Sequence, residues 1–199
     1  RGTAEAYRSY GMEKWRTRTI FQGDRTHVLP PRGSAATTVV DARGQTVQSI
    51  QYRGPALTDV PDATNYTYTK AGQLASVTDP AGSVWRYHYD FRGRMWKTED
   101  PDKGATELTY NDYDEVTTSK DGRQQVLAFA YDRLGRLVRT HEGSLTGPKR
   151  TEVVYDTLAK GHPTGSMRYV GTARYDTRVL GYDLGYRPTG TRVTLPLAE

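Results

Sequence analysis

Apolar and polar side chains alternate with a period of two through the middle of the chain. In residues 85–90 the aromatic side chains have one parity and the charged and histidine side chains have the other. The same alternation precedes Tyr68, Tyr110 and Tyr131, and in residues 127–131 it places Leu127 and Phe129 with the tyrosine. A period of two predicts half-buried strands, and no segment shows the 3.6-residue spacing of an amphipathic helix. We therefore expect an all-β fold with the tyrosines on the dry face of a sheet.

A short motif recurs along the same stretch. Its anchor tyrosines are Tyr68, Tyr89, Tyr110 and Tyr131 at intervals of 21 residues, then Tyr155 after 24. Three of these anchors are followed directly by an aspartate, namely Asp90, Asp132 and Asp156. The residue four places beyond the first four anchors is Gly72, Gly93, Asp114 or Gly135, and the residue eleven places beyond is Asp79, Asp100, Asp121 or Glu142. Six places beyond the same anchors stand Leu74, Met95, Val116 and Leu137, and four columns in phase over four units indicate an internal repeat.

The repeat has the turn chemistry of a β-hairpin. Asp-x-x-Gly, as in 132–135, is typical of a type I turn followed by a bulged glycine with positive φ. Asp114 replaces one glycine, and aspartate tolerates that conformation better than most residues. The chain then returns as a second strand and turns again, as in Asp79-Pro80, where proline presets the backbone. In the third unit this second turn is expected to shrink to Asp121-Gly122, and in the fourth it swells over 142–149.

These features predict about a dozen strands in repeated antiparallel hairpins that form one curved, spiralling sheet, an arc of a hollow β-shell. We expect a single repeat segment over 1–199, with degenerate hairpins in 1–64, regular repeats in 65–154 and degenerate repeats in 155–199. In the last part Tyr182-Asp183 keeps the motif with the glycine one place early. The chain begins at Arg1 without a methionine, which suggests a piece of something longer.

Composition excludes several classes of protein. The hydrophobic fraction is 35% and mean hydropathy is −0.77, so no stretch approaches the ~20 apolar residues of a membrane helix. There is no cysteine, and 15 tyrosines stand against 3 phenylalanines. The net charge is +5, but the basic residues are spread singly beside turn glycines, as in Gly93-Arg94 and Gly135-Arg136. This pattern favours a solvated surface over nucleic-acid binding.

Candidate chemistry is sparse. The four histidines are His27, His88, His141 and His162, and they lack the spacing of a metal site or a catalytic triad. Asp79, Asp100 and Asp121 could be imagined as an acid–base pair or a calcium ladder, but turn capping accounts for their spacing. No nucleophile elbow, P-loop or dinucleotide motif is present. We therefore expect no enzyme activity, cofactor or metal.

Aromatic rings could instead offer stacking faces for sugars. Trp85 and Tyr87 share the parity of Tyr89 and are expected on the dry face, whereas Trp96 has the opposite parity to Met95. Trp96 is therefore the candidate for an exposed, glycan-contacting ring.

Residues 65–154, with Tyr-Asp before the turn and Gly-Arg after it, resemble the YD repeat of the RHS family, which includes teneurins and insecticidal toxin complexes. Segments 77–82, 99–104 and 186–196 resemble very large secreted bacterial RHS proteins. The resemblance implies a β-ribbon that spirals into a hollow shell, which in toxin members encloses a C-terminal toxic domain and in teneurins serves cell adhesion.

By this resemblance the chain is a wall segment of a shell that encloses and delivers a toxin or effector domain in a larger secreted or cell-surface protein. Its expected partners are neighbouring repeats, or other copies through open sheet edges, and the enclosed domain. The alternative is a cell-surface or carbohydrate-recognition module that binds glycans. Toxin shells of the family usually end in Asp-Pro-x-Gly-Leu at a self-cleaving site. Here Asp79-Pro80-Ala81-Gly82 precedes Ser83 inside the repeat, so the autoprotease and the toxic domain are expected to lie elsewhere.

Overall fold

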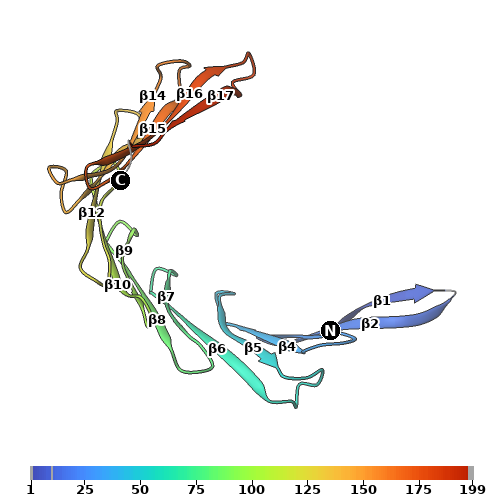
Figure 1. Cartoon of the computed structure of the whole chain (residues 1–199). Coiled ribbons are helices and arrows are strands. Elements are labelled where there is room, and N and C mark those ends of the chain that lie inside the picture. Colours follow the sequence, from blue (N-terminus) through green and yellow to red (C-terminus); the bar gives the residue numbers. More distant parts are fainter. Residues whose placement is uncertain (1, 10, 197–199) are drawn as a thin grey trace. The chain divides into compact units, whose positions relative to one another are not determined.

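The computed structural model describes residues 2–9 and 11–196, and in these residues the chain forms strands and turns without a helix. All 17 strands belong to one sheet (Figure 1). The strands are β1 (Gly2–Ser9), β2 (Met12–Gln22), β3 (Arg25–Leu29), β4 (Ala36–Val40), β5 (Thr46–Tyr52), β6 (Pro61–Tyr68), β7 (Leu74–Thr78), β8 (Val84–Tyr89), β9 (Met95–Asp100), β10 (Gly104–Tyr110), β11 (Val116–Lys120), β12 (Val126–Tyr131), β13 (Leu137–Glu142), β14 (Lys149–Tyr155), β15 (Pro163–Val170), β16 (Ala173–Tyr182) and β17 (Pro188–Thr194). The all-β, single-sheet prediction is confirmed. There are more strands than the expected dozen because the degenerate segments on either side of 65–154 also form hairpins.

The sheet divides into two compact units. The first comprises residues 1–88 with 98–102, and the second comprises 89–97 with 103–199. Within the first unit each strand from β1 to β8 pairs antiparallel with the next. Within the second unit β10 to β17 pair in the same way, as Figure 1 shows for β14 to β17. None of the described segments is a helix long and apolar enough to cross a membrane.

The turns after Tyr68, Tyr89, Tyr110 and Tyr131 have the predicted bulged geometry. In the turn at 132–136 the amide of Gly135 donates to the carbonyl of Asp132 at 3.1 Å, and the amide of Asp132 donates to the carbonyl of Arg136 at 3.0 Å. The Asp132 carboxylate also accepts from the amides of Leu134 and Arg136. Gly135 has φ of +73°. The aspartate therefore caps the turn and the glycine supplies its left-handed residue.

Two turns use other residues at the left-handed position. Asp114 has φ of +64°, as the sequence indicates. Tyr186 has φ of +58° because Gly185 comes one place too early to occupy that position.

The prediction for the second turn of the third unit is wrong. This turn does not shrink to Asp121-Gly122. The amide of Gln124 donates to the carbonyl of Asp121 at 2.9 Å, and Gln124 takes φ of +66°, so the turn has the same hydrogen-bond pattern as the one at Asp79. Gly122 has a different role, because a Cβ there would lie 2.4 Å from the carbonyl oxygen of Lys103 in the second turn of the preceding unit. The glycine permits a close approach of two backbones.

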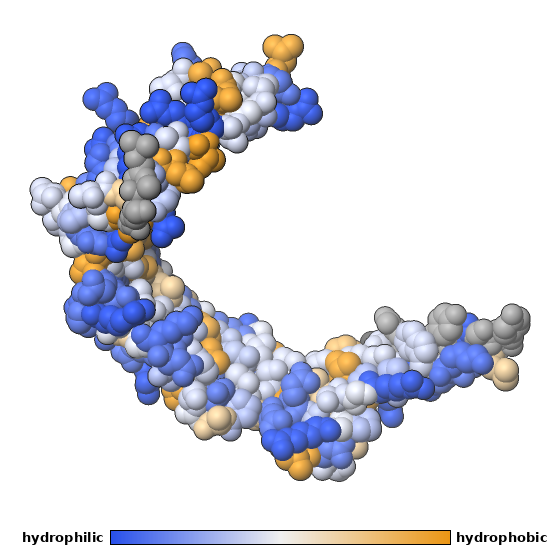
Figure 2. All heavy atoms as spheres, in the orientation of Figure 1, coloured by the Kyte–Doolittle hydropathy of each residue, from blue (hydrophilic) through white to orange (hydrophobic). Residues whose placement is uncertain are grey.

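Few of the described side chains are fully buried on either face of the sheet. Among the described residues the buried apolar side chains are Ala35, Val39, Ile50 and Ala128. On the visible face apolar residues form small patches among polar ones (Figure 2). In β12 the predicted dry face is wrong, because Leu127 is 38% exposed whereas Ala128, of opposite parity, is 2% exposed. No second layer covers the sheet, so cross-strand neighbours decide the burial of each residue.

Candidate functional site

Tyrosine hydroxyls join successive hairpins at five places in the described part of the chain. The Tyr131 hydroxyl donates to the carbonyl oxygen of Val116 at 3.0 Å, and Val116 is the first residue of the previous return strand. The same bond joins Tyr68 to Thr46 at 2.7 Å, Tyr110 to Met95 at 2.6 Å, Tyr155 to Leu137 at 3.4 Å and Tyr182 to Pro163 at 2.5 Å. Because phenylalanine cannot make this bond, it gives a physical reason for the large excess of tyrosine over phenylalanine.

Replacing Tyr131 with phenylalanine tests this contact. We expect the free energy of unfolding to fall by about 1 kcal/mol, since one half-buried hydrogen bond to the main chain is lost. Tyr113→Phe is the matched control, because Tyr113 is 86% exposed at a turn tip. Urea unfolding followed by circular dichroism measures both variants. Equal stabilities for the two would contradict a structural role for the Tyr131 hydroxyl.

A second inter-hairpin contact comes from Arg136, five residues after its anchor. Its Nε donates to the Asp132 carboxylate of its own turn at 2.7 Å, and its Nη2 donates to Asp156 of the next turn at 2.6 Å. The guanidinium carbon also lies 4.3 Å from the ring centre of Tyr155. Hydrogen bonding to Arg136, followed by the Gly161 amide, lowers the pKa of Asp156 to about 2.

Arg94 repeats this arrangement in an earlier unit. Its Nε donates to Asp90 at 2.7 Å, its Nη1 donates to Asp114 of the next turn at 2.7 Å, and its guanidinium carbon lies 4.6 Å from the ring centre of Tyr110. We call the fifth residue after each anchor the clamp position. The side chains of Arg94 and Arg136 are 20% and 22% exposed, so the predicted solvated surface is wrong for these two arginines. The Gly-Arg pair after the turn was the available signal.

The clamp position holds other residues elsewhere. Gln45 follows Val40, which occupies the anchor position of its hairpin, and its Nε2 donates to the carbonyl of Gly72 at 2.7 Å. Glu115 follows Tyr110, and its carboxylate accepts from the side-chain amide of Asn111 in its own turn at 2.6 Å.

The three recurring aspartates of the second turns cap their own turns. Asp79 accepts from the amide of Ser83, Asp100 accepts from the amide of Asp102, and Asp121 accepts from the amides of Arg123 and Gln125. The described part of the chain contains no group of three or more His, Asp or Glu residues placed to hold a metal ion.

The histidines occupy four separate environments. His27 hydrogen-bonds Thr37 at 2.7 Å, His88 hydrogen-bonds Glu99 at 3.2 Å, His141 hydrogen-bonds the carbonyl of Gly147 at 2.8 Å, and the His162 ring stacks on that of Tyr186 at 4.8 Å. The structure does not bring them together.

The tryptophans differ in exposure. Trp96 is 39% exposed. Trp85 and Tyr87 are half-buried, and the Trp85 indole donates to Asp100 at 3.2 Å. Trp96 is thus the most exposed of the three rings considered for sugar stacking.

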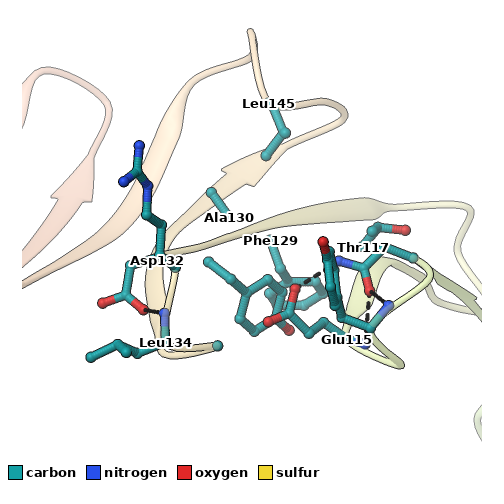
Figure 3. Close-up of a pocket in the computed structure, with 12 residues that line it drawn as sticks. Glu115, Thr117, Phe129, Ala130, Asp132, Leu134 and Leu145 are labelled. Carbon is teal, nitrogen blue, oxygen red and sulfur yellow. Dashed lines mark hydrogen bonds between the residues drawn. The ribbon is translucent and has the colours of Figure 1, made fainter.

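An open pocket of about 780 Å³ lies between the hairpins of Tyr110 and Tyr131 (Figure 3). Its lining includes Glu115 at the clamp position, the rings of Phe129 and Tyr131, and Leu134 of the next turn. Leu145 enters from the loop between β13 and β14. Along the chain, the exchange of Arg for Glu at the clamp position is the one feature that marks the place of this pocket.

Solved structures with the same fold include those of TcdB2-TccC3. The chain matches TcdB2-TccC3 with a TM-score of 0.76 and 17% identity over 93% of its length, and TcdB2-TccC3-Cdc42 with 0.76 and 18% over 98%. A form of TcdB2-TccC3 without its hypervariable C-terminal region matches with 0.75 and 18% over 96%. In each case the match covers 11% of the larger chain. At this identity the likeness establishes the fold.

None of the curated proteins matches the sequence. Residues 37–162 match the family described as Teneurin YD-shell, and this range includes both arginine clamps and most of the tyrosine contacts. It also extends into 37–64, where the repeat is worn. Since the match covers well over half of the chain, the protein belongs to the Teneurin YD-shell family.

Proposed function

We propose that this chain is a wall segment of a YD-repeat shell that encloses a toxin or effector domain within a larger secreted or cell-surface protein. The observation that carries the proposal is the succession of hairpins in one sheet, with a tyrosine hydroxyl tying one hairpin to its predecessor at five junctions and an arginine clamp doing so at two. These contacts act between neighbours along the ribbon, and they use the side chains that define the repeat. The residues of the motif thus serve construction of the wall.

The sheet edges support a role within a larger assembly. Among the described pairings, β1 pairs with β2 and β17 pairs with β16, so each end strand presents one edge without a partner in this chain. Such edges attract further strands. We infer that neighbouring repeats of the parent protein cover them. The fold match to only 11% of the TcdB2-TccC3 chains is consistent with a parent much longer than this chain.

Protection of the enclosed domain in the intact parent protein tests the proposal. Limited proteolysis is applied to the parent protein and to a form cleaved within the wall at a protease site inserted in the loop 143–147. We expect the effector domain to resist digestion until the wall is cut, because the shell excludes the protease. Equal digestion rates before and after cutting would refute enclosure. Cryo-electron microscopy of the parent would separately show whether these hairpins lie in a wall.

A further inference from the structure

The two arginine clamps show which chemical group fits between successive hairpins. At each clamp a guanidinium lies against the ring of the next anchor, Tyr110 or Tyr155, and pairs with carboxylates. A planar cation suits this position because it can stack on an aromatic ring while its N–H groups bind a carboxylate.

At the third junction of this kind the charge is reversed. Glu115 occupies the clamp position, and no cation of the described residues forms an ion pair with its carboxylate. The Tyr131 ring, which corresponds to the rings of Tyr110 and Tyr155, has no cation over it among the described residues. Burial, and then the charge of Glu115, raises the pKa of the Tyr131 hydroxyl. The ring of a clamp is therefore present, and a carboxylate stands at the position that holds the guanidinium in the two arginine clamps.

The pocket lies where the clamp would be. Its walls are the alternate residues from Asn111 to Thr117 of one hairpin and residues 129–135 of the next. In Figure 3 Glu115 and Leu134 lie on opposite sides, with Phe129 and Ala130 between them. The junction at Gln45 has a pocket of about 430 Å³ lined by the corresponding positions 41, 43, 45, 47 and 66–70. Recurrence at the same place in the repeat shows that the concavity belongs to the architecture of the junction.

The two pockets differ in the charge of the residue at the clamp position. The charged lining residues at the Glu115 junction are Glu115, Asp132 and Arg133, and the Asp132 carboxylate is already bound by Arg136. With Asp132 paired to Arg136, the charges of Glu115 and Arg133 balance, and Glu115 carries the lining carboxylate that no cation of the described residues pairs with. At the Gln45 junction the clamp residue is a neutral amide whose Nε2 is bound to Gly72.

We propose that the Glu115 pocket binds the guanidinium of an arginine side chain presented by a polypeptide segment outside this chain. The guanidinium stacks on Tyr131 and pairs with Glu115, as Arg94 stacks on Tyr110 and pairs with Asp114. Phe129, Leu134 and Leu145 contact the aliphatic stem of the arginine and an apolar neighbour in the same segment. This site is independent of whether the parent protein encloses a domain.

The test uses an acetylated, amidated Ala-Arg-Leu peptide titrated into the ¹⁵N-labelled chain and followed by nuclear magnetic resonance. The same peptide with citrulline, which has the shape of arginine without its charge, is the control ligand. We expect saturable shifts at Glu115, Tyr131 and Leu134 with a dissociation constant on the order of 1 mM, and binding weaker by about fivefold or more for the citrulline peptide. Equal binding of both peptides, or no saturable shift at these residues, would overturn the proposal.

Two variants separate binding from folding. Glu115→Gln retains the shape of the side chain and is expected to weaken arginine binding by about fivefold or more. Glu115→Arg places a guanidinium in the pocket from within, so we expect it to abolish peptide binding while the melting temperature stays the same or rises. Gln45→Arg is the matched control at the junction with a neutral clamp residue and should leave binding at Glu115 unchanged. A Glu115→Arg chain that is folded and still shows the shifts at Tyr131 and Leu134 would contradict the assigned site.

Discussion

Ala128→Lys is expected to lower the free energy of unfolding by about 3 kcal/mol or more, because it buries a charge without a partner. Ala128 is 2% exposed, and its cross-strand neighbours are Thr118 and His141. Neither offers a carboxylate to a lysine. The loss is expected as an earlier midpoint in urea unfolding.

Leu127→Lys is the control, one residue away on the opposite face. Leu127 is 38% exposed, so the lysine can reach water and the change in stability is expected to stay within about 0.5 kcal/mol. The comparison tests the parity of β12 directly. Equal losses at the two positions would contradict this parity, and a larger loss at Leu127 would show that the buried face is the one that alternation alone predicts.

Glu152→Gln is expected to destabilise the chain by about 2 kcal/mol at neutral pH. The Glu152 carboxylate accepts hydrogen bonds from Lys149 at 2.8 Å, Arg139 at 3.0 Å and Tyr169 at 3.0 Å, and its side chain is 17% exposed. The bond from Lys149 is the main cause that lowers the pKa of Glu152 to about 2. The folded pKa lies below the unfolded pKa of about 4.3, so the ionised carboxylate stabilises the folded state above that value.

The dependence on pH distinguishes this effect from a packing defect. As pH falls from about 5 towards 2, the Glu152 carboxylate becomes protonated and loses its favourable charge interactions. The difference in the free energy of unfolding between wild type and Glu152→Gln should therefore shrink. The measurement is the free energy of unfolding of both chains at several pH values. Glu142→Gln is the control, since the pair of Glu142 with Arg150 is exposed and is expected to contribute about 0.5 kcal/mol or less. A difference between wild type and Glu152→Gln that does not vary with pH would contradict the assigned role of the charge.

Much of the fold could be predicted because its determinants are local. The alternation of apolar and polar residues predicted the strands. The turn motif predicted which residues have positive φ, including Asp114. The error at Asp121-Gly122 arose because a glycine can serve either positive φ or a close approach of two backbones, and only the neighbouring Lys103 carbonyl distinguishes these roles.

The inter-hairpin contacts were harder to predict. The partner of the Tyr131 hydroxyl lies 15 residues away, and the Asp156 partner of Arg136 lies 20 residues away. Alternation within one strand says nothing about either contact. The composition did carry a signal, since a chain that needed only apolar rings would have no reason to prefer tyrosine. The Glu115 pocket needs both hairpins in place before its lining can be recognised.

The tyrosine hydroxyl bonds to the neighbouring hairpin and not to a distant one, and this has a consequence for how such genes change in length. Anchors such as Tyr110 and Tyr131 bond to the hairpin immediately before them, so a whole unit of 21 residues can be duplicated or deleted in frame and the new junction again joins a tyrosine to a carbonyl. Unequal recombination within a repeat tract therefore yields foldable products of different lengths. Insertion of half a unit would instead bring the wrong ends of the hairpins together.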